Sequence, residues 1–521
     1  MGRRNINKKL ECVSHMAMGI IILAAVSISI PAYPNDLTIE MPLLGSRDAD
    51  DETMTVSFDM SWDNSWRNSR NYDAVWIFVK FSTDGGDTWE HATMSSAGEN
   101  PSGFSGGYGT DVDLVVPSDK KGFFVRRAAS GAGTVGINGM EFVWAWGEDG
   151  VGATDDITLK VFGVEMVYVP KGSFYAGDGD GVTESRYAIH AQGADNTKAS
   201  ITASDTDITC DNNANDDMDT SSVTVNGLNG IDGNTSYPNG YRAFYVMKYE
   251  VTEGEWVGFF NMLSSAEKLN RDLTSLNGKN SDAVVDRNTV SWSSGSALTT
   301  RADRACSYLS WADICAYADW AALRPMSELE YEKAARGKNI APSDAGEYAW
   351  GDTGVTAATA INGVEDGTET ISTQDANACY NDNTFAGGDG GTGPLRAGIF
   401  ATSESTRHQA GAGYYGCMEL SGNLWERCVS VGNAAGRVFQ GTHGDGALTA
   451  IEGYEGNATN SDWPGYSEGQ GVISSAGSGF KGGSWLETTV GRMAISDRDR
   501  ASMTSSARIS DGGGRCARTA E

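Results

Sequence analysis

The feature that most constrains the fold is a turn-rich stretch at residues 414–427, in which small residues stand between large apolar ones. Gly422 and Asn423 permit backbone conformations that other residues avoid. Two carboxylates, Glu419 and Glu426, lie on either side of this corner. A turn with exposed carbonyls and a nearby carboxylate suits calcium, which takes about six to eight oxygen ligands. A polar corner between strands, with no ion, is the alternative interpretation.

The length of the chain indicates more than one domain. Its 521 residues exceed what a single hydrophobic core usually supports, so we expect two domains and a leader. The formal charge of −30 excludes binding to nucleic acid, because few groups could neutralise phosphates. The same charge argues against anionic lipid and suits a secreted protein with acidic, cation-binding loops.

Residues 1–32 have the composition of a secretory signal peptide. Four basic residues lie within residues 3–9, and the 13-residue apolar run at 18–30 is too short to cross a bilayer comfortably. Cleavage is expected near Ala32. No later segment has transmembrane character, so we expect a protein that is secreted or held at the cell surface or in the periplasm. Seven cysteines remain after cleavage, in a spacing that matches no zinc site.

Residues 36–160 are predicted to form a small β-sandwich. Short apolar or alternating runs at 75–81, 122–126, 140–146 and 157–162 are separated by turn-rich segments. The segment 82–89 fits the Asp-box pattern of sialidase-like propellers, which carry several copies of it. This chain has one copy, so we interpret it as a structural hairpin.

The second predicted domain covers residues 166–521 and contains an insertion at 178–240 rich in Asp, Asn and Gly. The acidic run 211–219 lacks the ligand spacing of a calcium loop, so we interpret the insertion as a solvated loop, with weak calcium binding as the alternative. Three helices are expected to begin after Thr252, Ser310 and Ser327. Thr252 and Ser327 are each followed three residues later by a glutamate, the pattern of a capping box.

Five blocks of this second domain are similar, in the correct order, to the formylglycine-generating enzyme (sulfatase-modifying factor) family. They are residues 245–253, 310–311, 324–337, 348–352, and the pair 414–427 with 480–485. The resemblance covers about residues 166 to 521. It implies an α+β fold with few helices, a variant of the C-type lectin fold, here preceded by the β-sandwich.

The resemblance also implies copper chemistry, for which this chain lacks the ligands. Members of that family oxidise a substrate cysteine with a copper ion held by two thiolates, since Cu(I) prefers soft sulfur ligands. The register set by residues 481–485 places Glu487 and Arg492 at the two cysteine positions. Ser484 and Trp425 match family positions that line the pocket. We therefore expect no copper and no oxidase activity.

The calcium ligands implied by the resemblance match this sequence better than the copper ligands do. One set of ligands would be the carbonyls of Glu419, Gly422 and Leu424 with the side chain of Glu426. Main-chain ligands tolerate sequence change, so substitutions there do little harm. A second site would begin at the pair Asn377 and Ala378. Its remaining ligands would lie in the loop 381–393, with Asp389 as a candidate.

One disulfide of the family is also expected to persist with a shifted partner. Cys516 occupies the family position, and the usual partner falls on Ala318. Cys315 lies about one turn earlier on the same helical face, so it could bond to Cys516 instead.

The C-terminal run 487–514 would line the ancestral pocket and is the predicted ligand surface. Charged side chains stand there among small residues, and an internal salt-bridge network is the alternative interpretation. The residues assigned to this surface are Trp485, Glu487, Arg492, Asp497, Arg498 and Arg500.

The functional hypothesis from the sequence is a secreted, calcium-stabilised binding protein for a polar ligand, either a protein or a glycan. The alternatives are a formylglycine-type oxidoreductase or another metal enzyme of the family, a variable protein of a diversity-generating retroelement, and a structural component of an export or motility machine. Tight copper binding with turnover of a cysteine peptide would favour the enzyme. A nearby reverse transcriptase would favour the retroelement protein, and stable co-purifying partners would favour the machine component.

Overall fold

The computed structural model describes residues 37–177, 189–191, 194–206, 231, 233–338, 346–501 and 503–521. The predicted signal peptide and most of the 178–240 insertion, including the acidic run 211–219, lie outside these residues. Within them, no helix combines the length and the apolar character that a membrane crossing requires.

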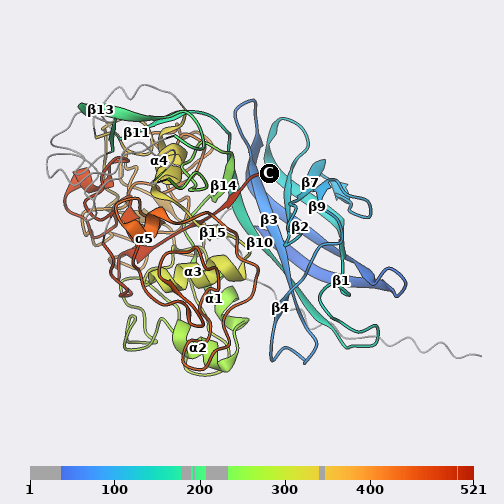
Figure 1. The fold of residues 1–521 in the computed structure, drawn as a ribbon. Coiled ribbons are helices and arrows are strands. Elements are labelled where there is room, and N and C mark those ends of the chain that lie inside the picture. The colour runs from blue at the N-terminus through green and yellow to red at the C-terminus, as the bar shows by residue number, and fades with distance from the viewer. Residues whose placement is uncertain are drawn as a thin grey trace, which may run out of the picture.

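The N-terminal region is a sandwich of two antiparallel layers (Figure 1). Every second residue of its long strand faces the core, as Val56, Phe58 and Met60 do, which confirms the alternation in the sequence. One layer has the order β1 (Thr38–Asp48), β2 (Thr53–Arg67), β9 (Gly131–Trp144) and β6 (Tyr108–Gly109). The other contains β3 (Asp73–Ser82), β8 (Phe123–Arg127), β7 (Val112–Val116) and β5 (Gly98–Glu99).

The second layer does not end at the sandwich. Strand β10 (Thr158–Val169) pairs with β3 along its length, for example Val161 with Val79. Its last residues also pair with β14 (Phe244–Met247), for example Val167 with Val246. The sheet then continues through β23 (Cys516–Thr519) to β15 (Arg324–Pro325). One sheet therefore joins both regions, and the break expected between residues 160 and 166 falls inside a single strand.

Strand β3 is buried on both faces, which explains its nearly continuous apolar sequence. Val75, Ile77 and Val79 belong to the core of the sandwich. Trp76 and Phe78 point the other way, into a core shared with the second region. Phe78 makes an edge contact with Trp320, with ring centroids 4.9 Å apart. The two regions therefore share a hydrophobic core as well as a sheet.

Residues 82–89 form the turn of a structural hairpin, as expected. Strand β4 (Glu90–His91) returns antiparallel to β3 after the turn. Asp84 accepts hydrogen bonds from the main-chain N–H groups of Asp87 and Thr88, each 3.0 Å long, and from the Thr88 hydroxyl at 2.6 Å. These bonds fix the turn, and they hold the pKa of Asp84 below its usual range, mainly through Thr88.

The helices of the second region begin where the sequence indicates. Capping boxes at Thr252, Ser310 and Ser327 each satisfy the first free N–H groups of a helix. Ser264 makes a fourth capping box that the sequence analysis did not predict. The described helices are α1 (Glu253–Asn261), α2 (Ser265–Arg271), α3 (Trp311–Trp320), α4 (Glu328–Arg336) and the short α5 (Ala434–Arg437).

The rest of the second region consists of small sheets and long loops. The three-stranded sheet β21 (Ser478–Lys481), β18 (Trp425–Val429) and β22 (Gly512–Gly513) carries the candidate site. The remaining strands are β11 (Phe174–Ala176), β12 (His190–Ala191), β13 (Ala194–Ile201), β16 (Ile361–Asn362), β17 (Thr370–Ile371), β19 (Tyr466–Ser467) and β20 (Gly471–Val472).

Candidate functional site

The turn-rich stretch leads into strand β18 through residues with unusual backbone. Glu419, Gly422 and Asn423 all have positive φ, at 54°, 95° and 66°. A side chain at Gly422 would place its Cβ 2.7 Å from the carbonyl oxygen of Cys379, so only glycine fits there. The corner is therefore tight, and its residues are buried.

On one side of this corner, Glu487 and Arg492 form an ion pair. Their closest atoms, Oε2 and Nη1, are 3.0 Å apart, and Arg492 belongs to a 3₁₀ turn over Val490–Met493. The buried Glu487 carboxylate also accepts the indole N–H of Trp425 at 3.2 Å and contacts Arg500 at 2.9 Å. Glu487 is therefore surrounded by donors and has no free side for a further ligand.

The ion pair extends into a wider network around Trp425. The Arg500 guanidinium lies over the indole ring of Trp425, 4.8 Å from its centroid, and 3.7 Å from Asp511. Asp511 in turn accepts the Ser484 hydroxyl at 3.0 Å. Arg492 contacts Asp499 at 2.9 Å. Side chains of this chain thus satisfy one another here.

On the other side of the corner, buried carboxylates gather around one arginine. Glu426 accepts two hydrogen bonds from Arg515, at 2.6 and 2.8 Å. Glu250 accepts the main-chain N–H of Leu424 at 2.9 Å and the side-chain amide of Asn423. No local sequence pattern singled out Glu250 or Arg515.

Glu419 completes this group, which we call the glutamate cluster (Glu250, Glu419 and Glu426). One oxygen of Glu419 accepts the N–H of Gly398 at 2.8 Å, and the other is buried without a hydrogen-bond partner among the described residues. Burial raises the pKa of Glu419 to about 7. Burial, and then repulsion from Glu426, raises the pKa of Glu250 well above its usual value. Burial therefore disfavours the charged forms of Glu250 and Glu419, and a bound cation would favour them.

Three main-chain carbonyls at this corner are also without partners. Within the described chain, the carbonyl oxygens of Glu419, Gly422 and Leu424 accept no hydrogen bond. Buried carbonyls are nearly always paired in folded proteins, so such a group requires an explanation. Unpaired carbonyls beside buried carboxylates are the donor set that a calcium ion prefers.

Comparison with known proteins identifies this architecture. The model of the sulfatase-modifying factor enzyme 1-like domain matches residues 160–520. The chain belongs to that family. A formylglycine-generating enzyme of Thermomonospora curvata is 30% identical over 135 residues, which are 26% of this chain and 36% of that protein. The matched part thus spans about a third of that relative's length.

In this member of the sulfatase-modifying factor family, the residues that stand at the two expected copper-ligand positions do not fit a copper ion. Glu487 and Arg492, five residues apart, still meet in space, but as a carboxylate and a guanidinium that bond to each other. Neither group supplies the soft sulfur that Cu(I) requires, and Arg492 brings a positive charge to the position.

The first calcium set fits, with one change. Both oxygens of Glu426 bond to Arg515, so the free carboxylate oxygen comes from Glu419 instead. Together with the carbonyls of Glu419, Gly422 and Leu424 it would hold the ion. No group of three or more His, Cys, Asp or Glu in the described ranges is arranged to hold a metal, so carbonyl oxygens would have to provide most of the ligands.

The second calcium set does not fit. The Asn377 side-chain oxygen accepts the N–H of Thr356 at 2.9 Å, and the Ala378 carbonyl accepts the N–H of Ala358 at 2.9 Å. Asp389 is held by two arginines, Arg287 at 3.1 Å and Arg304 at 3.3 Å. The oxygens that this prediction needs are therefore already bonded.

The predicted disulfide is not formed in the structure. Cys315 and Cys516 are both buried free thiols. Burial, followed by the charge of Cys516, raises the pKa of Cys315 well above its usual value. Both thiols therefore stay protonated in the core.

Most of the predicted ligand surface is interior. Trp485, Asp497 and Arg498 are 4%, 2% and 3% exposed, and Glu487 is buried as well. Arg498 is paired with Glu328 of α4 at 2.7 Å. Only the partly exposed side chains of Arg492 and Arg500 reach solvent. The alternative interpretation, an internal salt-bridge network, describes this segment.

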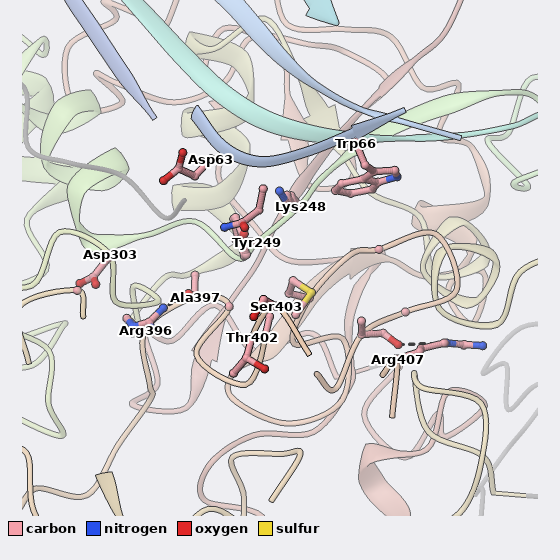
Figure 2. Close-up of a pocket in the computed structure, with 18 of the residues that line it drawn as sticks. Asp63, Trp66, Lys248, Tyr249, Asp303, Arg396, Ala397, Thr402, Ser403 and Arg407 are labelled. Carbon is pink, nitrogen blue, oxygen red and sulfur yellow. Dashed lines mark hydrogen bonds between the residues drawn. The ribbon is translucent and has the colours of Figure 1, made fainter. Parts of the chain in front are cut away.

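A pocket that the sequence analysis missed lies where the two regions meet (Figure 2). It has a volume of about 930 Å³. Asp63 and Trp66, at the end of β2, line it from the sandwich, and loops at 299–303, 396–403 and 412–418 line it from the family domain. Lys248 and Tyr249 lie between the two walls. Because these segments are far apart in the sequence, no local motif marks the pocket.

Proposed function

We propose that this protein is an exported, calcium-stabilised binding protein on a sulfatase-modifying factor scaffold, without the oxidase activity of formylglycine-generating enzymes. Its ligand would be polar, a protein or a glycan. The Glu487–Arg492 ion pair at the two copper positions carries the proposal. The basic and apolar N-terminal residues support export, and the unpaired carbonyls beside Glu419 support calcium.

The lack of oxidase activity follows from ligand chemistry. A copper oxidase of this kind needs two thiolates to hold Cu(I) and present it to oxygen. Here a carboxylate and a guanidinium neutralise each other at those positions, and Arg500 covers the adjacent face of Trp425. The scaffold is retained while the reacting centre is replaced by internal contacts.

An oxidation assay tests this proposal. The purified protein is incubated with Cu(I), oxygen, a thiol reductant and a cysteine-containing peptide, and the peptide is followed by mass spectrometry. We expect no conversion of cysteine to formylglycine above the protein-free reaction. A formylglycine-generating enzyme assayed in parallel shows that the conditions support turnover. Conversion by this protein that depends on copper would overturn the proposal.

A further inference from the structure

We infer that the pocket between the sandwich and the family domain binds a carbohydrate, with Asp303 and Trp66 as principal contacts. The inference rests on the proposed binding function and moves its site away from the C-terminal segment. The volume of about 930 Å³ lies within the range of roughly 300–1,000 Å³ usual for small-ligand sites. It is enough room for a short oligosaccharide.

The charges of the pocket favour a ligand without net charge. Lys248 is paired with Asp73 and Glu165, at 3.5 and 3.2 Å. Arg301 lies 3.6 Å from Glu365. Another basic residue of the lining, Arg396, lies 3.3 Å from Glu369. The remaining two, Arg70 and Arg407, lie over the ring of Tyr414. Because the lining also contains four acidic residues (Asp63, Asp303, Glu365 and Asp366), the pocket does not concentrate positive charge for a phosphate or a sulfate.

The pocket nevertheless contains polar groups that are free to bond. Asp303 is partly buried and makes no ion pair with a described residue; its Oδ2 is closed to solvent and has no partner among these residues, so a ligand would meet the carboxylate at Oδ1. Burial, followed by repulsion from Glu369, raises the pKa of Asp303. A carboxylate oxygen accepts hydrogen bonds from hydroxyl groups. A sugar hydroxyl could therefore donate to Oδ1 of Asp303 without adding charge.

Hydroxyl groups also line the pocket. Thr300, Thr402 and Ser403 carry them on the loops 299–303 and 396–403. Figure 2 shows Arg396, Thr402 and Ser403 on the wall opposite Trp66 and Lys248. Hydroxyls act both as donors and as acceptors, which matches a ligand with many hydroxyl groups.

Trp66 supplies the apolar part of the site. Its ring is partly exposed and lines the pocket from the end of β2. One side of the ring is covered by Lys248, whose Nζ is 5.0 Å from the ring centroid. The uncovered part can contact the C–H groups of a sugar ring, as aromatic side chains present an apolar body beside a polar surface.

Glycan binding by the full-length mature protein tests the inference. The probes are a panel of neutral oligosaccharides of two to six hexose or pentose units, screened on an array and followed by calorimetry. We expect at least one series to bind, and Asp303→Asn and Trp66→Ala each to weaken it by about tenfold or more, as the loss of one good contact does. The control Asp156→Asn, at an exposed carboxylate outside the pocket, should change affinity less than about twofold.

Circular dichroism and thermal melting show whether each variant is folded. The variant Asp303→Glu, which keeps the carboxylate, should retain part of the binding that is lost in Asp303→Asn.

Two results would overturn the inference: no oligosaccharide of the panel binds, or binding persists unchanged in both folded pocket variants. Capture of peptides instead of sugars in the pocket would also overturn it. The proposed loss of oxidase activity would stand in all three cases, because the oxidation assay tests it separately.

Discussion

At the scale of single residues, the proposed lack of oxidase activity rests on two positions, Glu487 and Arg492. The register of the residues before Trp485 identified Glu487 and Arg492 from the sequence alone. Their contact could not be predicted, because it depends on the 3₁₀ turn that contains Arg492 and on Arg500, which approaches Glu487 from a later loop. The burial of Asp497 and Arg498 was missed for a similar reason, since the partner of Arg498 is on α4.

The first prediction restores the missing ligands. Because the side chains at 487 and 492 meet within 3.0 Å, the double variant E487C/R492C should bind about one equivalent of Cu(I), which two soft thiolates favour. Anaerobic titration against a chromophoric Cu(I) chelator measures it. Each single cysteine variant is the matched control and should bind more weakly. A folded double variant that binds no better than the single variants would contradict the geometry.

The second prediction concerns Glu419 and pH. Burial raises its pKa from 4.5 to about 7, so the folded protein binds a proton that the unfolded chain releases. Without calcium, stability should therefore fall as pH rises from 4.5 to about 7. Glu419→Gln should flatten this part of the profile and be more stable than the wild type at pH 8. Melting temperatures in EDTA across this pH range measure it.

Calcium provides the matching control for Glu419. An ion bound at the unpaired Glu419 oxygen and the nearby carbonyls would stabilise the folded state by mass action. Added calcium should therefore raise the melting temperature of the wild type at pH 8, and raise it less at pH 5.5 and in Glu419→Gln. An identical calcium response in wild type and variant would show that Glu419 is not a ligand.

At the scale of secondary-structure elements, local signals were sufficient for the helices. Each capping box lies within four residues of sequence, so Thr252 and Ser327 could be recognised without tertiary information. Strand β10 shows what local signals could not predict. Its two ends were assigned to different domains because its pairing with β3 and β14 is not visible in the sequence. Buried strands carry no alternation that would mark their continuity.

The third prediction tests the connection between these strands. Lys248 follows β14 and bonds to Glu165 of β10 and Asp73 of β3, at 3.2 and 3.5 Å, where all three side chains are buried. Lys248→Met removes the cation that contacts both buried carboxylates and should lower the free energy of unfolding by about 3–5 kcal/mol. Denaturant unfolding measures it. Lys120→Met, which removes an exposed pair with Glu148, should cost less than about 1 kcal/mol.

At the scale of the whole molecule, the shared sheet makes the two regions one folding unit. Trp76 and Phe78 of the sandwich lie in the same core as Trp256 and Trp320 of the family domain. The pocket exists only because these regions are fixed against each other, with Asp63 and Trp66 on one side and Asp303 on the other. The sequence could indicate each region separately, but not the space that they enclose.

The fourth prediction follows from the sheet and the hydrophobic core that the two regions share. The full-length mature chain should unfold in a single transition, because separating the regions exposes a common core. A chain that begins at Met166 lacks β3 and two thirds of β10, which covers Thr158–Val169, so it should aggregate or show no cooperative transition. Differential scanning calorimetry measures both. A soluble, cooperatively melting 166–521 chain, together with two transitions in the full-length protein, would contradict a shared core.

The affinity of the wild-type protein for Cu(I) distinguishes a copper site that has been replaced from one that has been kept. In an anaerobic competition with a chromophoric chelator, the Glu487–Arg492 ion pair predicts no stoichiometric Cu(I) binding at that position. Replacing both residues by alanine should leave any residual copper uptake unchanged. Tight binding of one Cu(I) per chain that the double alanine variant abolishes would contradict the account.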